Sequence, residues 1–221
     1  MFQQIFQLIG KEFVLEWRQK YALNGLLLYV TSAIFVVYLC FNLETQRLQA
    51  ITWNTIFWLI LLFSAFNAVA KSFMQEKAGR FYYYYMSVNP YAIIISKIIY
   101  NALLMLLIAF VGLGGYSLLL GNPVEDLAFF ALNLLLGALG FSSTLTMISA
   151  IAAKAGNNAV LMAILGFPVI LPMLLLLIKV SKNAMDGLDR AVSTEEILTL
   201  LAINLIVVSV SYLLFGFLWR S

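Results

Sequence analysis

The sequence predicts an all-α, polytopic membrane protein with six transmembrane helices. Of its 221 residues, 63% are hydrophobic and only 10% are charged, whereas a soluble domain carries about 25% charged residues. The charged residues leave six uncharged runs of 23 to 27 residues, and about 20 apolar residues cross a hydrocarbon core. No strand-like alternation is present, so helices must satisfy the backbone hydrogen bonds in lipid. The predicted spans are approximately 22–42, 49–70, 98–120, 127–152, 156–178 and 197–219.

The N-terminal segment 1–20 is predicted to be an amphipathic helix that lies in the membrane interface. Charged residues interrupt it before any apolar core, so it is not a cleavable signal peptide. The alternative is a simple extension of the first span into water. The apolar residues that recur at three- and four-residue spacing are Phe2, Phe6, Ile9, Phe13 and Trp17.

Capping signals indicate where three of the helices begin. A third helix that starts at residue 90 could run to about residue 120, roughly 46 Å at 1.5 Å per residue, so it would tilt or project from the bilayer. The signals are Asn89-Pro90 ahead of the third span, Asn122-Pro123 ahead of the fourth, and a capping box of Ser193 and Glu196 ahead of the sixth.

Two spans contain residues that weaken a helix. Proline removes a backbone hydrogen bond and clashes with the preceding turn, and a kink in lipid persists only where neighbours satisfy the freed groups. Each position could be a moving joint or a static kink needed for packing, and both interpretations stay open. The candidate hinge or kink residues are Gly112, Gly114 and Gly115 in the third span and Pro168 and Pro172 in the fifth.

Polar, uncharged side chains inside the spans are interpreted mainly as interhelical hydrogen-bonding groups, with substrate binding as the alternative. Small residues at four-residue spacing, Ala138, Ser142 and Thr146, predict that the fourth helix is central and closely packed. The polar residues are Asn67, Asn101, Asn133, Asn204, Ser142, Ser143, Thr144, Thr146 and Ser149.

The residue types that are missing exclude several functions. The chain has no histidine, which excludes His-based acid–base catalysis and His-ligated metal. The predicted spans hold no Asp, Glu, Lys, Arg or His, which argues against ion-coupled transporters and intramembrane proteases. No phosphate-binding glycine loop or soluble domain is present, so any ATP must be bound by another subunit. We expect no enzymatic activity and no catalytic, cofactor or metal site in this chain.

Charge distribution predicts the orientation. Nine of the 13 basic residues lie on the side that holds both chain ends and segment 71–97, and this excess marks the cytoplasmic side. Segment 179–196 is then a periplasmic loop.

Segment 71–97 is the largest cytoplasmic piece. Glu76 and Arg80 are four residues apart and could pair on a short helix, and Phe73 adds an apolar face. Such a helix could dock into a groove on a partner. The alternative is an interfacial loop whose tyrosines lie among the lipid headgroups.

Several short motifs, in order and spacing, resemble those of the CcmB, or haem exporter B, permeases of cytochrome c maturation. They span most of the chain. They are Lys11-Glu12 with Glu16 and Arg18; Lys71-Ser72-Phe73 with Glu76 and Gly79; Ser87 with Pro90 and Lys97; and the run Leu165-Gly166-Phe167-Pro168-Val169-Ile170-Leu171-Pro172.

The resemblance implies an ABC-2-type permease subunit of the bacterial inner membrane, present in two copies. It implies a CcmA-like ATPase that binds ATP, CcmC- and CcmD-like membrane proteins that handle haem, and a CcmE-like periplasmic haem chaperone released by the complex. The implied ATPase-coupling residues are Phe73, Glu76, Gly79 and Arg80. This chain has Lys77-Ala78-Gly79-Arg80 where many relatives carry an acidic stretch. The alternatives are the permease of another ABC-2-type exporter, a membrane scaffold for a haem-handling partner, and a passive channel for a neutral solute.

Overall fold

A computed structural model of the chain describes residues 2–19, 21–43, 48–69, 71–74, 88–155 and 159–220, and these residues contain helices and no strand. The six long helices α2, α3, α6, α7, α8 and α9 are long and apolar enough to cross a membrane, which confirms the all-α polytopic fold. The elements are α1 (Phe2–Gln19), α2 (Tyr21–Leu43), α3 (Ala50–Val69), α4 (Lys71–Met74), α6 (Pro90–Leu120), α7 (Leu127–Lys154), α8 (Ala159–Met185), the 3₁₀ helix η1 (Arg190–Ser193) and α9 (Thr194–Arg220).

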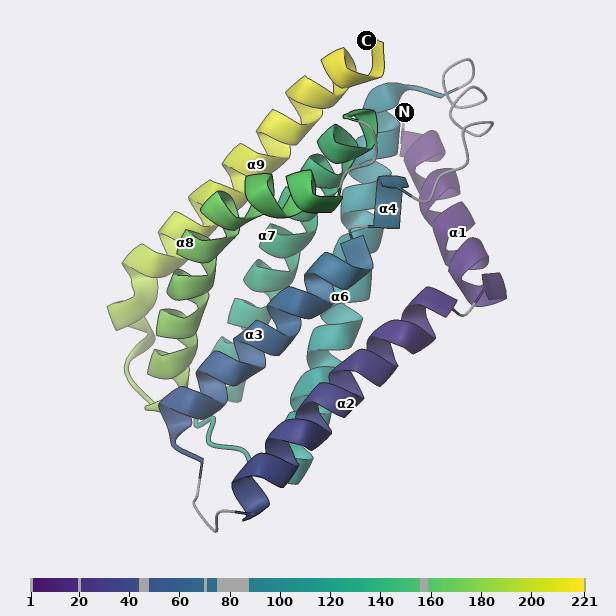
Figure 1. The fold of residues 1–221 in the computed structure, drawn as a ribbon. Coiled ribbons are helices and arrows are strands. Elements are labelled where there is room, and N and C mark those ends of the chain that lie inside the picture. The colour runs from purple at the N-terminus through teal and green to yellow at the C-terminus, as the bar shows by residue number, and fades with distance from the viewer. Residues whose placement is uncertain are drawn as a thin grey trace.

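Helix α7 is at the centre of the bundle. It lies behind α3 in Figure 1, with α6 on one side and α8 and α9 on the other. The small residues Ala138, Ser142 and Thr146 are all buried, which confirms the predicted central fourth helix. Gly137 and Gly140 also let side chains of neighbouring helices pack against the α7 backbone, because a Cβ on Gly137 would lie 2.7 Å from the Trp58 ring and one on Gly140 would lie 2.9 Å from Asn204 Oδ1.

The capping prediction is confirmed for α6 and wrong for α7. Asn89 Oδ1 accepts a 3.0 Å hydrogen bond from the Tyr91 N–H, and α6 runs from Pro90 to Leu120. Asn122 instead closes a local turn on the Val124 N–H. Asp126 is the cap of α7, because its carboxylate accepts from the Phe129 N–H at 3.0 Å.

The segment predicted as the loop 179–196 is largely helical. Helix α8 continues to Met185, and α9 begins at Thr194. The two residues of the predicted capping box make tertiary contacts instead: Ser193 Oγ accepts from Asn183 at 2.7 Å, and Glu196 pairs with Lys179 at 2.5 Å. The charges of Lys179 and Glu196 predicted a loop, but in the structure the two side chains form an ion pair between α8 and α9.

The weakened spans remain helical. A Cβ on Gly112 would lie 3.6 Å from Val30, and one on Gly115 would lie 3.7 Å from Ile34. These two glycines therefore face α2, whereas Gly114 faces open space. Helix α8 is continuous through Pro168 and Pro172, and it changes direction in its first half (Figure 1). Motion at these positions remains a prediction.

The predicted interhelical role holds for some of the polar side chains, whereas Asn67, Ser142 and Ser143 donate to carbonyl oxygens of their own helices. Asn101 donates to Thr146 Oγ1 at 2.8 Å, joining α6 to α7. Asn133 donates to the Leu177 carbonyl oxygen at 2.8 Å, and Asn204 to the Leu136 carbonyl oxygen at 3.2 Å. The central helix is thereby tied to three neighbours.

Candidate functional site: a junction of α1, α4, α6 and α7

The short helix α4 begins the segment that the sequence assigns to coupling, and Phe73 anchors it. The Phe73 side chain is 2% exposed, and its ring lies 5.5 Å from the Phe215 ring of α9. Its backbone N–H donates to Ser149 Oγ of α7 at 3.4 Å. An aromatic side chain buried in this way resists displacement from the bundle. The apolar cluster around it is Ile93, Ile94, Ile98, Ala150 and Phe215.

Lys97 of α6 is buried directly against α4. Its side chain is 4% exposed, and its ammonium donates a 2.6 Å hydrogen bond to the Ser72 carbonyl oxygen. The same nitrogen lies 4.7 Å from the centre of the Phe73 ring, within the range of a cation–π contact. Lys97 lies one residue before the predicted charge-free span, but helix α6 is continuous through it. A buried ammonium group must be paired and hydrogen-bonded to be tolerated.

Helix α1 supplies the negative charge that Lys97 requires. Glu12 Oε1 lies 3.6 Å from the Lys97 ammonium and 3.1 Å from the Lys11 ammonium. One turn later, Glu16 accepts a 2.7 Å hydrogen bond from the Leu23 N–H at the start of α2 and one of 3.5 Å from the Tyr100 hydroxyl of α6. The two carboxylates therefore fix α1 to α2 and α6.

The outward face of α1 carries the predicted apolar stripe. Phe2, Phe6 and Trp17 are 75% to 82% exposed, while Phe13 packs edge-on against Tyr100 at 5.3 Å. An amphipathic helix needs this exposed face to lie in the membrane interface. That location remains a prediction.

Asn101 completes the junction by joining α4 to α7. Its amide nitrogen donates to Ser72 Oγ at 3.2 Å and to Thr146 Oγ1 at 2.8 Å. Ser72 is thus held at its carbonyl oxygen by Lys97 and at its hydroxyl by Asn101. A displacement of α4 would pull on α6 and α7 together, so the arrangement is suited to transmitting movement.

The structure brings together three of the motifs quoted above, those containing Glu12 and Glu16, Ser72-Phe73, and Lys97. Of the predicted coupling residues, Phe73 lies in this junction, whereas Glu76, Gly79 and Arg80 fall outside the described residues. The candidate hinge residues lie elsewhere on α6 and α8.

Sequence reasoning missed the roles of Asn101 and Ser149 as contacts of α4. It also placed Lys97 at the edge of the third predicted span and did not predict its burial. The available signal was that Lys97 is the only charged residue between positions 90 and 120.

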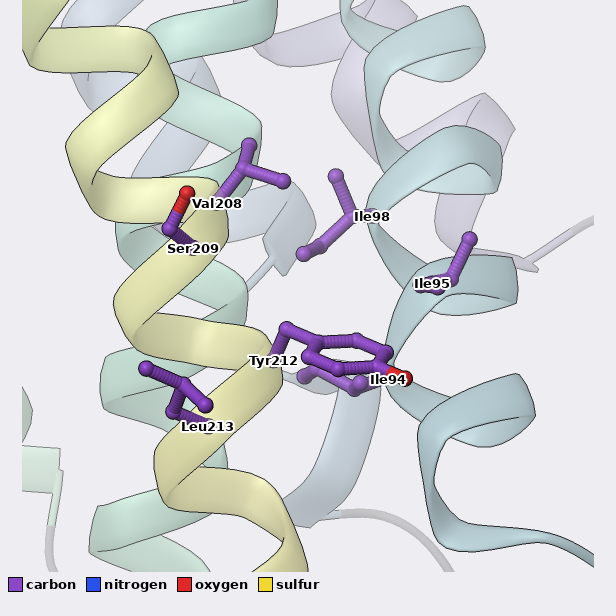
Figure 2. Close-up of a pocket in the computed structure, with 7 residues that line it drawn as sticks. All are labelled: Ile94, Ile95, Ile98, Val208, Ser209, Tyr212 and Leu213. Carbon is purple, nitrogen blue, oxygen red and sulfur yellow. The ribbon is translucent and has the colours of Figure 1, made fainter.

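A shallow groove of about 380 Å³ lies beside the junction, between α6 and α9. Figure 2 shows the side chains of the two helices facing each other across it. The lining contains no charged group that could fix an ionic ligand. The lining residues are Ile94, Ile95, Ile98, Val208, Ser209, Tyr212 and Leu213.

The model of the CcmB protein family matches residues 3–216, a range that contains the entire junction. No curated protein matches the chain.

Proposed function

Since the chain belongs to the CcmB family of ABC-type permeases for cytochrome c maturation and haem export, we propose that it couples ATP hydrolysis by a separate ATPase to release of the haem-loaded periplasmic chaperone. The chain is a multi-pass transmembrane subunit. Its task in this proposal is mechanical: nucleotide binding closes the ATPase pair, and the segment that begins at α4 carries that motion into the membrane helices.

The observation that carries the proposal is the way in which α4 is held. Ser72 and Phe73 are bound by Lys97, Asn101 and Ser149 through side chains of α6 and α7. A segment that only filled space at the membrane surface would not need a buried ammonium group. Since α4 directly precedes residues 75–87, a force on that segment would reach two long helices at once.

The proposed assembly contains several partners. We assign the ATP to a CcmA-like subunit and the haem to CcmC- and CcmD-like membrane proteins and a CcmE-like chaperone. Two copies of this chain are expected, because ATPase cassettes work as pairs. The excess of basic residues on one side supports an orientation with both chain ends in the cytoplasm. Membership of the CcmB family supports a bacterial inner-membrane location.

We assign different roles to the residues of the coupling segment and of the long helices. Phe73 anchors the segment in the bundle. Glu76, Gly79 and Arg80, which lie outside the described residues, contact the ATPase. Gly112, Gly114, Gly115, Pro168 and Pro172 are the positions at which the long helices would bend during the cycle.

The test is a charge reversal in the complete complex. Glu76→Lys should leave the chain in the membrane and preserve ATP hydrolysis while cytochrome c maturation falls at least about tenfold. Glu195→Lys is the matched control, because Glu195 is an exposed carboxylate at the opposite end of the bundle, and maturation should be unchanged. Normal maturation in the Glu76→Lys complex would contradict the coupling role. Normal maturation after deletion of the ATPase would instead favour the scaffold alternative.

A further inference from the structure

A cluster of polar side chains is buried between α3, α7 and α8, at the end of α3 that lies away from α4. It consists of Asn54 and Trp58 of α3, Asn133 of α7 and Ser181 of α8, each 1% exposed or less. Asn54 lies one turn after the start of α3, and Ser181 lies one turn before the end of α8. At 1.5 Å per residue the cluster is about 6 to 9 Å from the helix ends, yet its side chains are closed to bulk water.

Helix α8 fixes the orientation of the two asparagine amides. Asn54 Nδ2 donates to the Ile178 carbonyl oxygen at 2.8 Å, and Asn133 Nδ2 donates to the Leu177 carbonyl oxygen at 2.8 Å. A carbonyl oxygen only accepts, so each amide must turn its nitrogen toward α8 and its oxygen elsewhere. Because Leu177 and Ile178 are consecutive, both amides lie beside the same turn of α8.

The two amide oxygens have no donor among the described residues. Both Asn54 Oδ1 and Asn133 Oδ1 are buried and make no hydrogen bond there. A buried acceptor without a donor destabilises the fold, and buried polar groups are ordinarily paired with protein or with ordered water. Two such acceptors beside one helical turn therefore point to a bound donor.

Ser181 supplies the third polar group of the cluster. Its Oγ accepts hydrogen bonds of 2.7 Å from Asn133 Nδ2 and from Trp58 Nε1. A hydroxyl also has one hydrogen to donate, which these two bonds do not use. The cluster thus offers two acceptors and one donor to a small molecule. Buried water typically makes about three hydrogen bonds.

We propose that an ordered water molecule binds in this cluster, donates to Asn54 Oδ1 and Asn133 Oδ1, and accepts from the Ser181 hydroxyl. The side chains and carbonyls that form the site are all uncharged, so a cation bound there would lack a compensating negative charge. The inference does not depend on the coupling proposal. Its structural consequence is that the water fastens the start of α3 to α7 and α8, at the far end of the helix that precedes α4.

Asn204 provides a matched comparison on α9. Its amide nitrogen also donates to a carbonyl oxygen, that of Leu136 at 3.2 Å, and its Oδ1 also lacks a donor among the described residues. This oxygen, however, lies against the α7 backbone, since a Cβ on Gly140 would lie 2.9 Å from it. A Cα–H contact can partly satisfy such an oxygen. Asn204 is therefore the control amide.

The direct test is X-ray footprinting of the complete complex. A brief pulse produces hydroxyl radicals from water in place, and these oxidise a buried side chain only where a bound water lies beside it. Trp58 should be oxidised, whereas Met105, which is equally buried in the apolar core, should stay unmodified. Asn54→Leu and Asn133→Leu should each abolish the oxidation of Trp58, and Asn204→Leu should not. Protection of Trp58 equal to that of Met105 in the unchanged complex would overturn the inference.

A second measurement identifies the occupant through the unfolding midpoint in detergent. Asn54→Leu should lower the midpoint, because it removes an oxygen that water satisfies, whereas a dry oxygen would make the same change neutral or stabilising. The midpoint of the unchanged chain should be the same in sodium, potassium and choline chloride. A midpoint raised by sodium or potassium alone would assign the site to a cation and overturn the water. None of these outcomes alters the coupling proposal, which cytochrome c maturation tests separately.

Discussion

The Lys97 ammonium donates a 2.6 Å hydrogen bond to the Ser72 carbonyl oxygen, across 25 residues of sequence. This contact joins the second turn of α6 to α4, the short helix that follows α3. Because Glu12 of α1 lies 3.6 Å from the same ammonium, one buried charge connects the N-terminal helix, the coupling segment and a membrane-spanning helix. The geometry explains why motifs far apart in the sequence belong to one site.

Lys97→Met should destabilise the junction. The methionine keeps most of the side-chain volume but leaves the Ser72 carbonyl oxygen without its donor, which typically costs about 1–3 kcal/mol. The unfolding midpoint in detergent, followed by circular dichroism, should fall, and maturation activity should fall with it. Lys182→Met is the control, because Lys182 is largely exposed. Equal midpoints for the two variants would contradict the structural role of Lys97.

Phe73→Ala should be the most destabilising single change at α4. The ring is 2% exposed, and removal of a buried phenylalanine ring costs about 3–5 kcal/mol in protein cores. Phe217→Ala, at a residue 76% exposed, serves as the comparison. Limited proteolysis of the segment that follows α4 should accelerate in Phe73→Ala alone. An unchanged cleavage rate would mean that Phe73 does not anchor the segment.

The hydrogen bond between Asn101 and Thr146 can be measured by a double-mutant cycle with Asn101→Leu and Thr146→Val. Interhelical hydrogen bonds in membrane proteins average about 0.6 kcal/mol, with a maximum near 1.7. The cycle should give a coupling within that range, because the two side chains are 1% exposed or less and 2.8 Å apart. Zero coupling in the unfolding free energy would show that Asn101 does not fasten α6 to α7.

The opposite end of the bundle contains a pH-dependent contact. Arg190 donates from Nε to Asp126 Oδ2 at 2.7 Å and from Nη2 to Oδ1 at 3.1 Å. This pair, together with the Phe129 N–H, holds the pKa of the Asp126 carboxyl below its usual value of 3.8. Because the pKa is lower in the folded state, the contact stabilises the protein fully above that usual value and is lost as the pH falls through the folded pKa.

Asp126→Asn should therefore lower the unfolding midpoint at pH 7 and have progressively less effect below about pH 4. Midpoints of the variant and the unchanged chain, measured between pH 7 and pH 3, check this. A difference that grew upon acidification would contradict the assignment of the pair.

The sequence predicted the membrane-spanning architecture well because charge and hydropathy determine which segments can enter lipid. Local sequence signals predict the six spans, the central position of α7 and the start of α6 at Pro90. The tertiary contacts in the structure agree with all three. Capping of α7 was mispredicted because Asn122 and Asp126 are both good capping residues. In the structure the Asp126 carboxylate accepts from the Phe129 N–H and also from Arg190, a contact 64 residues away that local signals do not reveal.

The candidate site was predictable only in part. The spacing around Phe73 indicated a segment with an apolar face, and the structure places that side chain in the core. The burial of Lys97 was not predictable, because a lysine at the edge of a span ordinarily extends its ammonium to the interface. In the structure, Glu12, the Ser72 carbonyl oxygen and the Phe73 ring all lie close to the buried ammonium and favour its burial.

The central claim, that a separate ATPase drives this chain through the segment beyond α4, is tested most directly by photo-cross-linking. A photoreactive amino acid is placed at Glu76 in the complete complex, and at Glu195 as the control, and the adducts are identified by mass spectrometry. We predict a covalent adduct between position 76 and an ATP-binding subunit, and none from position 195. A complex purified intact in which position 76 reacts only with lipid, or in which no ATP-binding subunit is present, would contradict the claim.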